Sequence, residues 1–323
     1  MKVVKTVVVL LLIFTAFGFT ADRTVTLTVP GKALSITIDY SNGCLIKELK
    51  IKGRNVLSAA GVYTGIKTKN GLYTSLSKVS DIKLTENKQI VTLSGIKYGD
   101  GDITVSETWT FKINGDKIHW SITRMYNNNA EVESTAFPQY NFADLNVWKG
   151  GILDNGGMVW CKYLKQVNDT YGVHTGGVTF WNAESGDGLR ISTKTDHAIA
   201  TKYLHSTNNE FVCSQSVTNE PLGQRYNLSR FVAGKADVFA PFKVKKEIVK
   251  LDVDLQYIDY FKTYSRGTLP GIDAVAVREL LNTTGRYGVV DNNIIGANGW
   301  VTNWKCLHEP FFAQIGMAVD DKN

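Results

Sequence analysis

The sequence is poor in cysteine and has no closely spaced cysteine pair. Its four cysteines, in 323 residues, are Cys44, Cys161, Cys213 and Cys306, and none of them belongs to a CxxC motif. This spacing excludes a zinc ribbon and a thioredoxin-type redox centre. If a disulfide forms, we expect it between Cys161 and Cys213, because both lie in predicted strands of one domain. We favour the interpretation that the cysteines are buried free thiols.

Signatures of nucleotide chemistry and of serine-type nucleophilic catalysis are also missing. The chain has no P-loop, no GxGxxG run followed by a helix and no Ser-His-Asp signature. The formal net charge is +6, and lysine and arginine are scattered singly apart from residues 243–246, which we assign to a solvated edge strand. We therefore expect no nucleic-acid partner, no metal site and no cofactor.

A hydrophobic run long enough to cross a bilayer is absent as well. The N-terminus instead combines Lys2 and Lys5 with a short apolar core at residues 7–14, followed by small residues that suit cleavage. This pattern predicts a signal peptide at residues 1–21. The mature protein is then periplasmic or secreted and is not held in a membrane.

The dominant hydrophobic period of residues 22–256 is two, which predicts a large antiparallel β-sandwich in one domain. Two alternating runs, 103–113 and 118–122, flank the turn at 114–116 and predict a hairpin. Glu107 interrupts the first run on its inward side. Further strands are expected at 158–164, 178–181, 189–192, 211–214, 226–232 and 245–255.

Near the C-terminus the hydrophobic period becomes helical. Apolar spacings of three and four predict helices at 272–284 and at 307–319, and Pro310 falls in the first turn of the second one. Residues 257–268, rich in aromatic and charged side chains, are expected to be a packed connector. Residues 269–323 are therefore predicted to form one helical hairpin.

Four short runs in this hairpin carry a family resemblance: NTTGRYGV at 282–289, GANGW at 296–300, CLHE at 306–309 and QIGMA at 314–318. They resemble the opening hairpin of the six-hairpin, (α/α)6-toroid glycosidases of the rhamnosidase-like group, in which a β-sandwich precedes the toroid. The resemblance covers about the last sixth of the chain. It implies a mainly β fold, with a large supersandwich-like domain followed by the first hairpin of an incomplete toroid.

The function that the resemblance implies is that of an exported glycoside hydrolase acting on a poly- or oligosaccharide. In that group the acid and the base come from later helices, so no catalytic role is transferred to a residue of this chain. Hydrolysis needs two carboxylates, roughly 5–5.5 Å apart for retention or 6.5–9.5 Å for inversion. We therefore expect this chain by itself to be inactive.

Glu309 is the one weak catalytic candidate. It follows His308 at the start of the second predicted helix and lies near Trp300 and Trp304 in the sequence. The alternative is a carboxylate that only stabilises the helix N-terminus. We favour the second interpretation.

Five side chains of the same region are candidates for binding the sugar. Asp291 and Asn298 could accept or donate hydrogen bonds to hydroxyl groups, and Trp300 could offer a ring face. A simple turn and a packed tryptophan are the alternative. The complete set is Asp291, Asn298, Trp300, Trp304 and His308.

The middle of the sandwich region is rich in aromatic residues and glycine. It includes residues 148–151, Trp160 and the segment 174–181, in which His174 begins a possible ligand loop. A lone histidine in such a loop is also compatible with a structural hydrogen bond.

Two other functions stay open beside the hydrolase. One is a non-catalytic carbohydrate-binding or assembly module. The other is a polysaccharide lyase, although the lyases in question place the toroid before the sandwich. Each of the three predicts a carbohydrate partner.

Overall fold

The computed structural model describes residues 23–78, 81–87, 90–154, 158–168, 170–173, 176–218, 230–232 and 242–263. Strands dominate this part of the chain, and every strand pair in it is antiparallel. The predicted mainly β fold with large antiparallel sheets is confirmed for these residues. The signal peptide, the helical hairpin and Cys306 lie outside them.

The first large sheet, called sheet A, has 11 strands. Two of them lie off the main path: β4 pairs with β3, and β6 pairs with β5. The main path runs β1 (Thr24–Thr28), β2 (Leu34–Asp39), β3 (Leu45–Ile51), β5 (Leu57–Thr68), β12 (Ser134–Phe142), β19 (Phe211–Thr218), β18 (Ala198–His205), β15 (Thr170–Val173) and β20 (Arg230–Val232); the side strands are β4 (Arg54–Asn55) and β6 (Gly71–Thr74).

The second large sheet, called sheet B, has nine strands. A separate third sheet consists of two strands, β11 (Ala130–Val132) and β21 (Phe242–Val244). Three short helices complete the described elements: η1 (Pro30–Lys32), η2 (Cys161–Tyr163) and α1 (Tyr260–Thr263). The order in sheet B is β14 (Met158–Trp160), β13 (Gly150–Leu153), β16 (Gly177–Trp181), β17 (Asp187–Lys194), β22 (Ile248–Asp259), β10 (Lys117–Tyr126), β9 (Thr104–Asn114), β8 (Ile90–Gly99) and β7 (Lys83–Asn87).

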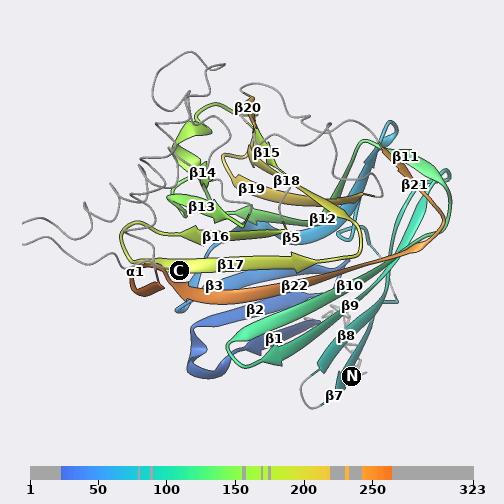
Figure 1. The fold of residues 1–323 in the computed structure, drawn as a ribbon. Helices are drawn as coiled ribbons and strands as arrows, with labels where there is room; N and C mark the ends of the chain where they lie inside the picture. The colour runs from blue at the N-terminus through green and yellow to red at the C-terminus, as the bar shows by residue number, and fades with distance from the viewer. Residues whose placement is uncertain are drawn as a thin grey trace, which may run out of the picture.

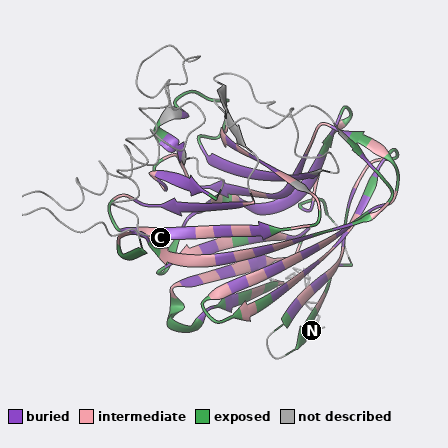
Figure 2. Cartoon of the chain, in the orientation of Figure 1, coloured by how far each residue is buried: buried purple, intermediate pink, exposed green. Residues whose placement is uncertain are grey.

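Sheets A and B lie against each other as two layers (Figure 1). Burial alternates along the strands, as on β10, where every second residue is buried (Figure 2). The buried side chains of both sheets form one hydrophobic cluster. Its sheet B side includes Trp109, Phe111 and Trp120, whose rings pack at centroid distances of 4.9–6.3 Å.

The predicted central hairpin is confirmed. Strands β9 and β10 pair from Lys117 opposite Asn114 to Tyr126 opposite Val105, around the expected turn. The strand expected at 158–164 is wrong beyond Trp160, because the Leu164 N–H bonds to the Cys161 carbonyl at 3.0 Å and closes η2. Strand β22 continues to Asp259, past the expected end of the sandwich at residue 256.

The buried free thiols that the sequence favours are confirmed for the described cysteines. Cys44, Cys161 and Cys213 are buried free thiols. Cys161 lies in η2 and not in a strand, whereas Cys213 points into the core from β19. Burial raises the pKa of the Cys161 thiol and of the Cys213 thiol, so both stay protonated.

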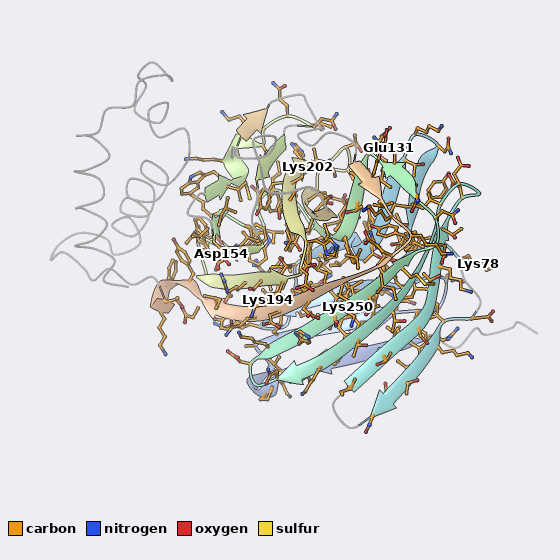
Figure 3. All side chains as sticks on the ribbon, turned by 45° about the vertical axis from the view of Figure 1, so that its right-hand side comes forward. Lys78, Glu131, Asp154, Lys194, Lys202 and Lys250 are labelled. Carbon is orange, nitrogen blue, oxygen red and sulfur yellow. The ribbon has the colours of Figure 1, made fainter. Side chains whose placement is uncertain are left out.

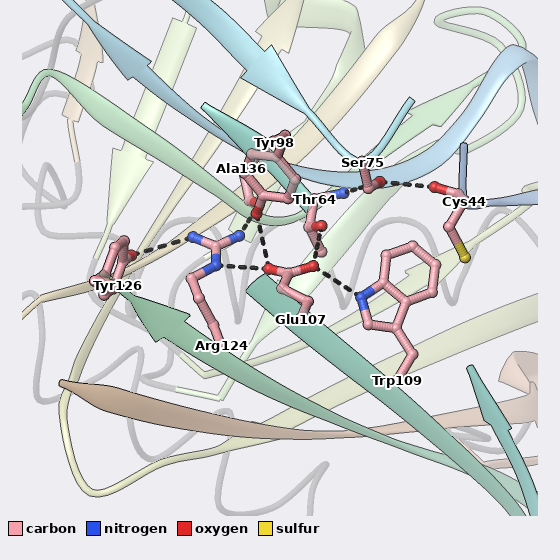
Figure 4. Close-up of polar contacts among 9 residues, drawn as sticks. All are labelled: Cys44, Thr64, Ser75, Tyr98, Glu107, Trp109, Arg124, Tyr126 and Ala136. Carbon is pink, nitrogen blue, oxygen red and sulfur yellow. Dashed lines mark hydrogen bonds and ion pairs between the residues drawn. The ribbon is translucent and has the colours of Figure 1, made fainter. Parts of the chain in front are cut away.

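A buried ion pair lies between the two sheets (Figure 4). Arg124 Nε donates to Glu107 Oε1 at 2.6 Å, and both side chains are 0% exposed. Glu107 also accepts hydrogen bonds from Thr64 of sheet A, from Tyr98 and from Trp109, at 2.5–2.9 Å. The inward orientation predicted for Glu107 is therefore confirmed.

The arginine completes the connection between the sheets. Its Nη2 donates to the carbonyl of Ala136 on β12 at 3.1 Å, and its Nη1 donates to Tyr126 Oη at 3.2 Å. The ring centroid of Phe137 lies 3.8 Å from the guanidinium carbon. Each charge thus has several partners, which a buried pair requires if it is not to destabilise the fold.

We expect Arg124→Met to lower the free energy of unfolding by about 3–5 kcal/mol, because it leaves the Glu107 carboxylate buried without its counter-ion. The double variant Glu107→Gln, Arg124→Met should lose less than the sum of the two single variants. Urea unfolding followed by tryptophan fluorescence measures all three.

The matched control is Lys50→Met, which removes an ion pair of 2.8 Å with Glu48 whose side chains are 36% and 34% exposed. It should cost less than about 1 kcal/mol. Equal losses for Arg124→Met and Lys50→Met would contradict the importance of the buried pair.

Candidate functional site

A cavity of about 570 Å3 is lined by residues of β4, of the β12–β13 connection, of η2 with the segment after it, and of the β16–β17 turn, and we call it the end cavity. Both sheets contribute to it, because Arg54 comes from β4 of sheet A and most other lining residues come from connections of sheet B. The lining residues are Arg54, Leu145, Asn146, Trp148, Lys149, Cys161, Lys162, Leu164, Lys165, Asn182, Ala183 and Glu184.

The β12–β13 connection forms one wall of this end cavity. Asp144 Oδ1 accepts the backbone N–H groups of Asn146 at 2.6 Å and of Val147 at 3.1 Å, which is an Asx-type turn. The Ala143 N–H donates to the carbonyl of Val56, beside β4. The connection is therefore fixed at both ends before Trp148 enters the cavity wall.

The β16–β17 turn forms the facing wall, and Asn182 organises it. The Asn182 Oδ1 accepts the backbone N–H groups of Glu184 and Ser185, each at 3.0 Å. The Asn182 Nδ2 donates to the carbonyl of Val147 at 3.2 Å, so the two walls are joined. Because the side chain of Asn182 makes these bonds, it shapes the cavity and is not free to bind a ligand.

The floor of the end cavity is apolar and rigid. Trp148 is 1% exposed, stacks on Phe180 at 5.8 Å and meets Phe142 edge-on at 5.5 Å. Cys161 and Leu164 beside it are also buried. Since the Cys161 thiol is protonated, it offers no thiolate nucleophile.

Positive charge dominates the rim. Arg54, Lys149, Lys162 and Lys165 line the cavity, against the single carboxylate of Glu184 among its described lining residues. Arg54 and Lys165 are exposed, and no ion pair or side-chain hydrogen bond is recorded for either within the described segments. Their donors are therefore available to a ligand.

A polar clasp holds the arginine side of the cavity in place. Lys52 and Gly53 form the turn between β3 and β4, with φ of 47° and 85°, as in a type I′ hairpin. Lys52 Nζ lies 2.9 Å from Asp187 Oδ1, at the start of β17, and 5.1 Å from the ring centroid of Tyr257. Tyr257 Oη donates to the same Asp187 oxygen at 3.1 Å. The clasp joins the turn that carries Arg54 to the strand that follows Glu184.

A second cavity, of about 540 Å3, lies at the opposite end, near β11 and its labelled residue Glu131 (Figure 3). Its lining includes Asp102, Glu131 and Glu133, but Glu133 pairs with Lys67 at 2.7 Å and Asn70 donates to Asp102 at 3.0 Å. In the described segments no three His, Cys, Asp or Glu side chains are grouped to hold a metal ion. This second cavity is therefore the weaker candidate.

The sequence-predicted site residues are placed only in part. Trp148 and Lys149 of the aromatic middle stretch line the end cavity. Trp160 and Trp181 instead pack with Tyr260 of α1 in a small separate cluster. His174 and the C-terminal candidates Asp291, Asn298, Trp300, Trp304, His308 and Glu309 lie outside the described residues.

Sequence reasoning missed Arg54, Lys165 and Glu184. Arg54 lies in β4, Lys165 in the segment after η2 and Glu184 in the β16–β17 turn. No regular spacing along the sequence relates the three residues. Only the folding of the β3–β4 hairpin onto the β16–β17 turn brings them together, so a pattern along the chain carries no signal for this site.

Comparison with protein-family models and with curated proteins gives no match. Solved structures give distant similarities. The Slr1438 protein from Synechocystis sp. PCC 6803 is 11% identical with a TM-score of 0.46, over 74% of this chain and 97% of that one. A putative aldose 1-epimerase from Escherichia coli K12 is 9% identical with a TM-score of 0.44, over 73% and 99%.

The GH36 α-galactosidase AgaA from Geobacillus stearothermophilus, as its A355E variant, is 10% identical with a TM-score of 0.44. The similarity covers 74% of this chain and 41% of that enzyme. With TM-scores below 0.5, these similarities assign neither a family nor an activity to this chain. The toroid expected from the rhamnosidase-like resemblance lies outside the described residues and stays a prediction.

No helix among the described residues is long and apolar enough to cross a membrane.

The contacts of Asp187 with Lys52 and Tyr257 in the clasp make the stability of the fold depend on pH in the acid range. Partial burial by itself would raise the pKa of Asp187, but the hydrogen bonds from Lys52, Ser185 and Tyr257 outweigh it and hold this pKa below its ordinary value of 3.8. A carboxylate with a lowered pKa stabilises the fold above its ordinary pKa, and the stabilisation is lost as the pH falls through the pKa of the folded state.

We expect Asp187→Asn to lower the free energy of unfolding by up to about 1 kcal/mol at neutral pH, since its ion-pair partner Lys52 is 53% exposed and solvent screens the pair. The difference from the parent chain should be constant above about pH 5 and should disappear as the pH falls below 3.8. Denaturant unfolding across this range is the measurement. The control is Asp196→Asn, which replaces an exposed aspartate that makes no ion pair within the described segments and should leave the stability unchanged. A loss of stability for Asp187→Asn that does not depend on pH would contradict the prediction.

Proposed function

We propose that the described β-sandwich is a carbohydrate-binding module and that the end cavity is its binding site. The observation that carries this proposal is a cavity of about 570 Å3, held by fixed turns, whose rim presents the donors of Arg54 and Lys165. Volumes of about 300–1,000 Å3 are typical of small-molecule sites. Saccharides are rich in oxygen acceptors and suit a donor-rich rim above an apolar floor.

The lining favours binding over hydrolysis. Glycoside hydrolysis needs two carboxylates on either side of the scissile bond. Among the described lining residues Glu184 alone is a carboxylate, and burial raises the pKa of the Cys161 thiol, which keeps it protonated. The described lining thus supports recognition of a sugar and gives no pair for its cleavage.

The reading as part of an exported glycoside hydrolase is compatible with this module but depends on residues outside the described part. Glu309 and the predicted sugar-binding residues belong to that segment. Export to the periplasm or beyond depends on the predicted signal peptide at residues 1–21. Both are proposals for the whole protein, and the binding module is the function that the described geometry supports best.

The test is a steric block of the cavity. Affinity electrophoresis of the full chain in gels containing a panel of soluble polysaccharides should show retardation by at least one of them. Ala183→Trp places a large ring in the cavity lining and should abolish the retardation.

The matched control is Ala130→Trp, the same substitution in the lining of the second cavity at the opposite end. It should leave the retardation unchanged, and thermal unfolding should verify that both variants fold. If no polysaccharide retards the parent chain, or if Ala130→Trp and Ala183→Trp behave alike, the end cavity is not a carbohydrate site.

A further inference from the structure

The rim of the end cavity is more positive than recognition of a neutral sugar requires. Four cationic side chains face one carboxylate among the described lining residues. They come from three places: Arg54 from β4, Lys149 from the residue before β13, and Lys162 and Lys165 from η2 and the segment after it. The charge is therefore assembled by the fold and does not reflect a basic run in the sequence.

Two of these cationic groups, Arg54 and Lys165, take no part in holding the cavity walls. The clasp that fixes the β3–β4 turn uses Lys52, and the turns of both walls are held by Asp144 and Asn182. Arg54 and Lys165 make no ion pair within the described segments. An anion that binds between them is therefore attracted by both charges.

We propose that the end cavity binds an acidic saccharide, one that carries carboxylate or sulfate groups, in preference to a neutral one. This inference rests on the proposed carbohydrate-binding function and adds the ligand class. A guanidinium presents two parallel donors that match a carboxylate or a sulfate, and lysine ammonium groups add charge without demanding one geometry. Arg54 is accordingly the orienting contact and Lys165 a supporting one.

The first measurement compares oligosaccharides that differ only in charge. Isothermal titration of the full chain uses an oligogalacturonate, a neutral galactose oligomer of the same length and linkage, and a sulfated form of that oligomer. At least one acidic oligomer should bind ten or more times tighter than the neutral one. The advantage should shrink as salt rises from about 50 to about 500 mM, because exposed charges are screened.

The second measurement uses charge-removing variants. Arg54→Ala and Lys165→Ala should each weaken binding of the acidic oligomer about tenfold. They should weaken binding of the neutral oligomer much less, because a hydroxyl group loses one hydrogen bond and no charge pairing. Arg54→Lys should recover part of the loss, since it restores the charge without the planar fork. The control is Lys250→Ala, an exposed lysine on β22 that does not line the cavity (Figure 3), and it should have no effect.

The outcomes separate this inference from the proposed function. Equal affinity for acidic and neutral oligomers would overturn the preference for acid and leave the carbohydrate site in place. Binding of inorganic sulfate as tight as that of the oligomers would show a simple anion site and overturn both. If no oligomer binds while a neutral polysaccharide of the panel retards the chain, this inference is wrong and the carbohydrate site stays. If neither the oligomers nor the panel bind, the proposed function is wrong as well. A preference for the carboxylated or for the sulfated oligomer supports the inference and identifies the acidic group.

Discussion

The ion pair of Glu107 and Arg124 is the constraint on which the alignment of the two sheets depends. Glu107 accepts a hydrogen bond from Thr64 of sheet A, and Arg124 donates to the Ala136 carbonyl of the same sheet. A slip of β9 by one residue would turn the Glu107 side chain to the outer face and leave a buried guanidinium without its counter-ion. The hydrophobic cluster alone tolerates sliding better, because apolar contacts are not directional. The pair therefore selects one alignment among several that would bury similar area.

Alignment of the sheets decides the shape of the sandwich end. With β12 fixed at Ala136, its last residues reach Phe142, and the following connection is set against the β16–β17 turn by Asp144 and Asn182. The clasp of Lys52 with Asp187 then brings the β3–β4 hairpin of sheet A to the same place. A cavity whose walls are fixed in advance loses less conformational entropy when a ligand binds.

The sequence predicts the layers better than the site, and the reason is physical. Period-two alternation follows directly from the pleat, so the β9–β10 hairpin and the inward Glu107 are predictable from local pattern. The end of β14 cannot be predicted from local pattern, because a hydrogen bond from the Leu164 N–H to the Cys161 carbonyl replaces strand pairing there. A Cys161–Cys213 disulfide stayed an alternative in the sequence because Cys161 was expected in a strand, whereas it lies in η2. Arg54 and Lys165 come together only through contacts between sheets, which no one-dimensional pattern encodes.

The outer faces of the sheets are poorer candidates than the end because their polar groups already bind each other. On sheet A, Gln139 donates to Tyr63 at 2.6 Å and to Asn141 at 2.9 Å, and Asn141 donates to the Gly61 carbonyl. On sheet B, Arg190 binds both carboxylate oxygens of Asp154 at 2.8 Å. A ligand there must break a hydrogen bond for each one that it makes, so little net free energy is gained. At the end cavity the donors of Arg54 and Lys165 exchange only water for a ligand oxygen. Recognition is therefore expected at the end cavity, where Arg54 and Lys165 make no ion pair within the described residues.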